Sequence, residues 1–149
     1  MTKNYEKDGL SCSYQCNWKI KYDEVYQELG RVVAVEDSNN GIFVISLFPL
    51  EVPLDLEEYA EETKREWKSR IKNGKDFDIK TSEITRNILL EPSSGIRLKF
   101  SFENIPYTQD LFLVKGKKRI AVVALQTIDK NLENADKDFQ AIFDSLEFE

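Results

Sequence analysis

The stretch Arg119-Ile-Ala-Val-Val-Ala-Leu-Gln-Thr-Ile128 decides the fold. From Ile120 to Ile128 it carries no charge, and apolar residues occupy both alternating sets of positions. A strand with one face in water alternates apolar and polar residues, whereas a strand covered on both faces is apolar throughout. The run is rich in β-branched residues and follows a turn signal at Lys115-Gly116-Lys117. The sequence therefore predicts an interior strand with a layer packed on each side of its sheet.

A hairpin is predicted upstream of this run. Arg31–Val35 and Ile42–Phe48 flank Asp37–Gly41, and Asn40-Gly41 suits the positive φ values of a tight turn. The two strands should be antiparallel neighbours. Apolar residues occupy both alternating sets of positions in Ile42–Phe48, so this strand should also lie in the interior of the sheet.

Alternating patterns predict the remaining strands, and those in the second half of the chain are expected to form a meander. Leu10–Tyr14 is expected to be a first strand that Trp18–Tyr22 continues, and Pro92–Gly95 is expected to be a turn. The later strands are Phe77–Thr81, Ile96–Phe102 and Leu111–Val114.

Two amphipathic helices can cover the sheet. The first, Asp55–Lys72, has Asp55 as N-cap, Glu58 in the capping-box position and Asn73-Gly74 after its end. Its apolar stripe is Leu56, Ala60, Thr63, Trp67 and Ile71. The second helix places Ala135, Phe139, Ile142, Phe143 and Leu146 on one stripe. We therefore predict one domain over residues 1–149: an α/β, three-layer α/β/α sandwich around a mainly antiparallel, twisted sheet of about six or seven strands.

The residue inventory argues against catalysis. The chain has no histidine, which removes the commonest general base and metal ligand. It has no glycine-rich phosphate loop, and most carboxylates fall on helix faces. We expect no enzyme activity, no cofactor and no metal site. Trp18 and Trp67 could form a ligand cage, but core anchors are the favoured interpretation.

Cys12 and Cys16 are the only cysteines. On one extended strand their Cα atoms would stand roughly 13 Å apart, beyond the reach of a disulfide. Two buried free thiols are expected, and a disulfide would need a tight turn between them.

The charges separate along the chain. The net charge is −6, which disfavours nucleic acid or an anionic membrane as partner and favours a basic protein. Residues 51–66 hold 7 acidic and 2 basic side chains, whereas residues 67–128 hold 12 basic and 6 acidic ones. No apolar stretch reaches the roughly 20 residues of a membrane span, and the first residues lack the apolar core of a signal peptide. A cytoplasmic location is therefore expected.

Two short motifs resemble a known superfamily. Ser13-Tyr14-Gln15-Cys16-Asn17-Trp18 resembles the Tyr-Pro-x-x-Trp opening of the PsbP-like superfamily, with Gln15 in place of the proline. Phe139-Gln-Ala-Ile-Phe-Asp-Ser-Leu-Glu-Phe148 resembles that superfamily's final helix and its Ile-x-x-Ser-Leu/Phe-x-Phe ending. The superfamily includes bacterial DcrB-like and LpqN-like domains. The resemblance implies a single sandwich that serves as a binding module.

The resemblance also implies two bacterial roles. One is an immunity protein that binds and neutralises a cognate toxin domain, with an ADP-ribosyltransferase or another translation-blocking toxin as a special case. The other is an adaptor that shields apolar segments of a secreted toxin; a further non-enzymatic binding role stays open. Acidic helix faces suit fast capture of a basic toxin domain, although they could serve solubility alone. On a helical wheel Glu58, Glu61 and Glu62 point away from the Ala60–Trp67 stripe, so they are the predicted partner-binding residues.

Overall fold

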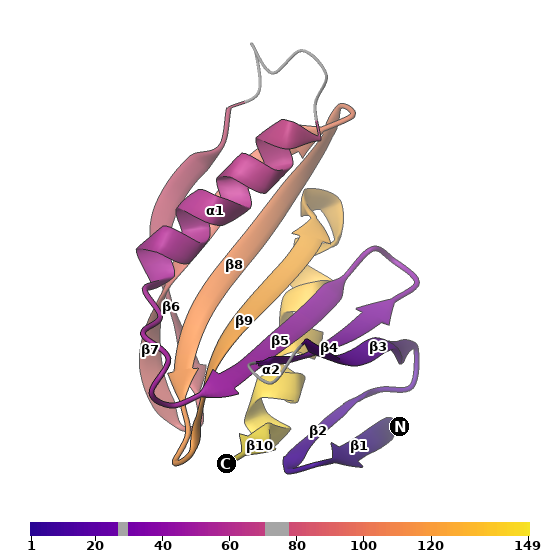
Figure 1. The fold of residues 1–149 in the computed structure, drawn as a ribbon. Helices are drawn as coiled ribbons and strands as arrows, with labels where there is room; N and C mark the ends of the chain where they lie inside the picture. Colours follow the sequence, from indigo (N-terminus) through magenta and orange to yellow (C-terminus); the bar gives the residue numbers. More distant parts are fainter. Residues whose placement is uncertain (27–29, 71–77) are drawn as a thin grey trace.

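The computed structural model describes residues 1–26, 30–70 and 78–149. Its main body is a seven-stranded antiparallel sheet in the order β3-β4-β5-β9-β8-β7-β6 (Figure 1). These strands span Trp18–Tyr26 (β3), Gly30–Asp37 (β4), Ile42–Pro49 (β5), Lys80–Ile88 (β6), Glu91–Phe102 (β7), Ile105–Lys115 (β8) and Arg119–Ile128 (β9). A second, three-stranded sheet has the order β1-β2-β10, from Thr2–Lys7 (β1), Leu10–Gln15 (β2) and Glu147–Phe148 (β10).

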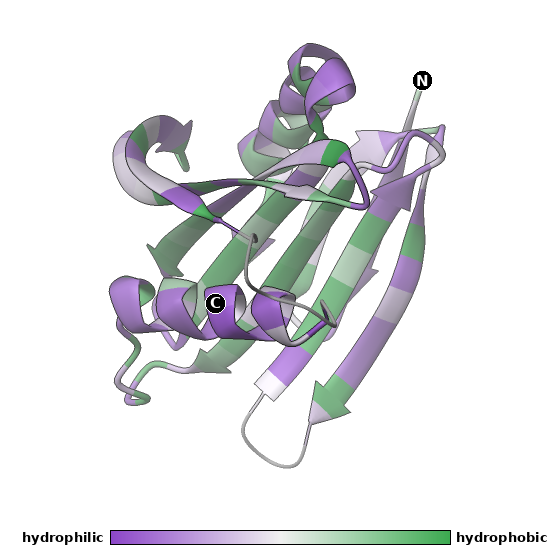
Figure 2. Ribbon diagram, turned by 90° about the horizontal axis from the view of Figure 1, so that it is seen from above, coloured by the Kyte–Doolittle hydropathy of each residue, from purple (hydrophilic) through white to green (hydrophobic). Residues whose placement is uncertain are grey.

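The central strand is the one that the sequence predicts. β9 lies between β5 and β8, and its residues from Ile120 to Val123 are all buried. β5 lies between β4 and β9, and Asn40 takes a φ of 66° in the turn before it. Both interior strands and the predicted hairpin are confirmed. Figure 2 shows hydrophobic residues concentrated along these middle strands.

The two helices lie on opposite faces of the large sheet (Figure 1). The helix α1 (Leu56–Ser69) packs through Ala60 and Trp67 against Leu98, Phe100 and Leu111. The helix α2 (Leu132–Ser145) follows a short 3-10 turn (Asp129–Asn131) and shares the other core with β2, β4, β5 and β9. The five stripe residues predicted for this second helix are all buried.

The second core differs from the α/β/α expectation because the small sheet joins α2 in covering that face. Leu10, Cys12 and Tyr14 point from β2 into the core that α2 forms with the large sheet. The backbone N–H of Ser13 donates to Ser145 Oγ at 2.7 Å. The expectation that Trp18–Tyr22 continues the first strand is wrong, since β2 and β3 belong to different sheets. β1 was not predicted because its residues are polar and largely exposed.

The predicted turn at Pro92–Gly95 is also wrong. β7 begins at Glu91, and the turn falls on Leu89-Leu90, where φ is 53° and 68°. Pairing of β7 with β8 starts only at Gly95, so the missing N–H of Pro92 interrupts no bond on that side. At Gly95 the ring of Phe112 lies 2.5 Å from where a Cβ would stand, so glycine allows the close packing.

Three smaller expectations concern the strand after α1 and the cysteines. β6 starts at Lys80, later than the predicted Phe77–Thr81. Phe77, Ile71 and Asn73-Gly74 lie outside the described residues. Both cysteines are free, but only Cys12 is buried; Cys16 is exposed in the turn after β2, so the expectation of two buried thiols is half wrong.

Candidate functional site

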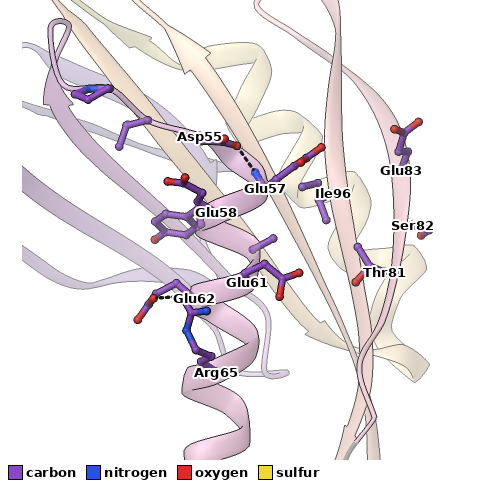
Figure 3. Close-up of a pocket in the computed structure, with 14 residues that line it drawn as sticks. Asp55, Glu57, Glu58, Glu61, Glu62, Arg65, Thr81, Ser82, Glu83 and Ile96 are labelled. Carbon is purple, nitrogen blue, oxygen red and sulfur yellow. Dashed lines mark hydrogen bonds and ion pairs between the residues drawn. The ribbon is translucent and has the colours of Figure 1, made fainter.

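A groove runs between α1 and the edge strand β6, and we name it the α1–β6 groove (Figure 3). Its volume is about 980 Å³. Helix α1 forms one wall, Thr81, Ser82 and Glu83 of β6 form the other, and Ile96 of β7 lies between them. Six carboxylates line it: Asp55, Glu57, Glu58, Glu61, Glu62 and Glu83. Arg65 is the basic residue among the lining side chains.

Local sequence explains how α1 presents these carboxylates. Asp55 caps the helix by accepting a hydrogen bond from Glu57 N–H at 2.9 Å. The buried residues Ala60, Thr63 and Trp67 place one face of the helix on β7 and β8. Acidic side chains in the first turn are favourable there, because the unpaired N–H groups give a helix N-terminus partial positive charge. The same sequence therefore stabilises the helix and makes the groove acidic.

The three predicted glutamates are all exposed and all line the groove. Glu61 points toward β6, whereas Glu58 and Glu62 point to the other side of the helix (Figure 3). Their orientation away from the core is thus as expected, but they do not share one side of the helix. Their role in binding a partner stays a prediction.

Two of these glutamates form ion pairs with basic side chains of the same helix. Lys64 donates to Glu61 at 3.0 Å, and Arg65 contacts Glu62 at 2.5 Å. The hydrogen bond from Lys64, and then its charge, lower the pKa of Glu61. Among the described residues, Asp55, Glu57, Glu58 and Glu83 form no ion pair within the groove. The N-terminal half of α1 and the facing part of β6 therefore carry the uncompensated negative charge.

Sequence reasoning missed Glu83, Asp55 and Glu57 as members of the site. Asp55 and Glu57 are visible as the start of a helix, but only the packing of α1 beside β6 makes them part of a groove. The strand was predicted to end at Thr81, so Glu83 had no assigned place. The alternation Thr81, Glu83, Thr85 was the available signal for the longer strand.

The chemistry of the groove suits binding of cationic groups. Its polar lining consists of carboxylates, hydroxyl groups and one guanidinium, and it is open to solvent. Solvated carboxylates attract Lys and Arg side chains and increase the rate of encounter with a basic surface. No cluster of three or more candidate metal ligands occurs within the described ranges. In that same part of the chain, no helix is both long and apolar enough to cross a membrane.

A second groove lies on the α2 side of β6, and its charges are largely paired. Arg86 bonds Gln140 and Asp136, while Arg97 makes two bonds to Asp110 at 2.8 and 2.9 Å. The bond to Asp110 raises the pKa of Arg97. This groove is therefore less strongly charged than the α1–β6 groove.

Solved structures show which fold this is. No protein-family model matches the chain, and no curated protein matches it in sequence. The cyanobacterial PsbP (CyanoP) from Synechocystis sp. PCC 6803 aligns with a TM-score of 0.56 and 12% identity, covering 99% of this chain and 92% of that one. LpqN, involved in cell envelope biogenesis of Mycobacterium tuberculosis, aligns with a TM-score of 0.53 and 12% identity, covering 100% and 91%. The chain has the PsbP-like fold that the sequence motifs indicate.

Proposed function

We propose that this PsbP-like chain is a non-enzymatic binding module, and specifically an immunity protein that neutralises a toxin domain by direct contact. The observation that supports the proposal is the α1–β6 groove, where four solvent-facing carboxylates form no ion pair with any other described residue. The partner is then a basic protein surface. Helix α1 covers one face of the large sheet, and α2 and the small sheet cover the other. This packing keeps the groove preorganised.

The physical role of the carboxylates is to steer the encounter. Rim charges stay solvated, so they change the association rate more than the lifetime of the complex. Apolar contacts within the groove, for example with Ile96, supply part of the affinity. The complex should form more slowly as salt screens the charges.

The test combines growth and binding. The chain is co-expressed with each candidate toxin from its genomic neighbourhood, and growth rescue and association rate are measured for wild type and for the triple variant Glu58→Lys, Glu61→Lys, Glu62→Lys. We expect the variant to associate at least tenfold more slowly at low salt and to rescue poorly. The matched control reverses Glu6, Glu133 and Glu147, which are exposed outside the groove, and it should bind as wild type.

Two outcomes would overturn parts of the proposal. An unchanged association rate of the folded groove variant at low salt would remove the groove as the steering surface. Failure of every toxin-like neighbour to bind would remove the immunity role.

One observation favours the adaptor as a second candidate. Most of the large apolar side chains that are exposed in the described residues lie at one end of the large sheet, where β3, β5 and β6 end: Val25, Tyr26, Leu50, Leu89 and Leu90. An adaptor would bind an apolar toxin segment here, with little dependence on salt. Replacing Leu89 and Leu90 by serine would then abolish binding, whereas the groove variant would not.

A further inference from the structure

The edge strand β6 carries an open row of main-chain hydrogen-bonding groups. It pairs with β7 through all nine residues, from Lys80↔Lys99 to Ile88↔Glu91, with no shift of register. Within the described residues nothing pairs with its other side. In a two-residue hairpin the residues that flank the turn form a hydrogen-bonded pair, so alternate residues beyond them face outward. Counting back from Ile88, the peptide groups of Thr81, Glu83, Thr85 and Asn87 point away from the sheet.

A side-chain contact agrees with this assignment. The amide Nε2 of Gln140 donates to the carbonyl oxygen of Asn87 at 2.9 Å, which requires that carbonyl to point outward. Helix α2 thus occupies the end of the row. Among the described residues, no backbone group forms a hydrogen bond with the outward peptide groups of Thr81, Glu83 or Thr85.

The other edge of the same sheet is protected. β3 has a break in register between Ile20 and Tyr22, and Lys19 and Lys21 lie on either side of Ile20. Its far half is tied to the small sheet by the contact between Tyr5 and Asp23. Bulges, lysines and covering elements are the devices that stop strands from adding to an edge. In contrast, β6 has no bulge, and its one lysine is its first residue. The side chain of Arg86 lies against α2, where it bonds Gln140 and contacts the ring of Phe143. The two edges therefore differ in their capacity to accept a strand.

The surroundings of β6 determine what kind of strand would fit. Thr81 pairs with Leu98 and Glu83 with Ile96, both of which face the α1 core, so the side chains of Thr81 and Glu83 lie on the α1 side. Ile84 and Ile88 pack into the opposite core. Side chains of an added strand would alternate in the same way. Every second one would enter the α1–β6 groove beside Glu83, Glu57 and Glu61, where a Lys or Arg matches the charge.

We propose that β6 binds an extended segment of the partner as an additional strand of the large sheet, with basic side chains at alternate positions in the α1–β6 groove. Main-chain hydrogen bonds then supply affinity, and the acidic groove selects the sequence. This inference rests on the proposed function, because it specifies how the same groove holds its basic partner.

The probe is a capped eight-residue peptide, Lys-Val-Lys-Thr-Lys-Val-Lys-Thr, titrated against the full chain by NMR. In the free protein the amides of Thr81, Glu83 and Thr85 should exchange fast, and those of Ser82, Ile84 and Arg86 slowly. Saturating peptide should slow the first set at least tenfold and leave the second unchanged. A peptide with its four lysines placed together should bind at least tenfold more weakly. Binding without selective protection of the outward amides would overturn the proposal.

Two peptides N-methylated on alternate nitrogens give a second readout. One of them should lose at least tenfold in affinity and the other should bind as the parent, since only one set of peptide groups can face β6. Equal losses, or none, would contradict strand addition.

The protein-side test is Thr85→Pro, compared with Thr85→Ala. Proline removes only an outward N–H, which an edge strand tolerates, so the fold should persist while peptide affinity falls at least tenfold. If the Glu58, Glu61 and Glu62 reversal abolishes binding but Thr85→Pro and N-methylation do not, the groove binds the partner and strand addition is wrong. If none of these changes alters binding, the peptide binds elsewhere, so both the acidic groove as the binding surface and strand addition are wrong.

Discussion

Trp67 holds α1 on the sheet. Its ring centroid lies 4.5 Å from that of Phe100 and 5.5 Å from that of Phe102, and its indole N–H donates to Gln109 at 3.1 Å. The guanidinium of Arg70 lies over the ring at 4.7 Å. One residue thus combines apolar burial, a satisfied polar group and a cation–π contact. Because the α1–β6 groove exists only while α1 stays docked, Trp67 supports the site without lining it.

Replacing Trp67 with alanine should lower the free energy of unfolding by about 3–5 kcal/mol, because it leaves a cavity under α1 and an unpaired Gln109. Urea unfolding followed by circular dichroism measures the change. The control is Arg70→Ala, which removes only an exposed contact and should cost about 1 kcal/mol or less. A Trp67→Ala loss below about 1 kcal/mol would exclude the tryptophan from the core.

The two thiols should react very differently. Burial raises the pKa of Cys12 to about 11, so at pH 8 little thiolate forms and the reagent cannot reach the sulfur. Cys16 is exposed. We expect a thiol-specific reagent to modify Cys16 in the native protein and Cys12 only after unfolding. Both cysteines lie on the tryptic peptide Asp8–Lys19, so fragmentation of that peptide in the mass spectrometer shows which thiol carries the label. Rapid native labelling of Cys12 would contradict the packing of β2.

At the scale of elements, the β6–β7 hairpin uses an unusual turn. Leu89 and Leu90 both have positive φ, and Leu90 is 99% exposed. Asn-Gly is the usual pair for such a turn, because a branched apolar side chain disfavours the left-handed region. The backbone conformation of Leu89 and Leu90 therefore lowers the stability of the chain, and it exposes the side chain of Leu90 to water.

The double change Leu89→Asn, Leu90→Gly should relieve that strain and stabilise the chain by about 1–2 kcal/mol. The control, Leu90→Ala, keeps a Cβ at positive φ and should change stability by less than about 0.5 kcal/mol. Thermal unfolding of the three proteins gives the comparison. If the double change destabilises the chain, the leucines make stabilising contacts that outweigh the strain.

At the scale of the whole molecule, Arg31 joins the two sheets. From β4 of the large sheet it pairs with Asp23 of β3, and its Nη1 donates to the carbonyl of Lys7 at 2.9 Å in the small sheet. Tyr5 of β1 contacts the same Asp23. The side chains of Arg31 and Asp23 are only 7% and 12% exposed, so the pair is shielded from salt. This network fixes the β1–β2 hairpin end of the small sheet to the large sheet.

Stability should depend on pH through Asp23. The hydrogen bonds from Arg31 hold the pKa of Asp23 below its ordinary value. A carboxyl with a lowered folded pKa contributes stability above its unfolded pKa, near 4, and loses that contribution as pH falls through the folded pKa. Asp23→Asn should therefore cost about 3 kcal/mol at pH 7, because it leaves Arg31 buried and unpaired.

Unfolding free energies of wild type and Asp23→Asn, measured from pH 7 down to pH 2, test this. The difference should be constant at neutral pH and shrink below pH 4. The control is Glu36→Gln, whose pairs with Lys19 and Lys21 involve exposed lysines and should contribute about 0–1 kcal/mol. If the difference in unfolding free energy between wild type and Asp23→Asn does not change with pH, the charge of Asp23 does not stabilise the contact between the two sheets.

The sequence by itself determined the large sheet's centre and both helices. Continuous apolar runs in β5 and β9 and single apolar stripes on α1 and α2 are local patterns, and burial follows from them directly. Asp55 as N-cap and the outward orientation of Glu58, Glu61 and Glu62 are equally local.

Only the tertiary structure decided that β2 leaves the large sheet, because the alternation of its residues would fit either sheet. It also decided that Leu89-Leu90 is a turn, since the pairing of β6 with β7, which joins Asn87 to Pro92 and Ile88 to Glu91, places Pro92 inside β7. Glu83 joined the site for the same reason: no local pattern records which strand becomes the edge beside α1, whereas the pairing order of the whole sheet does.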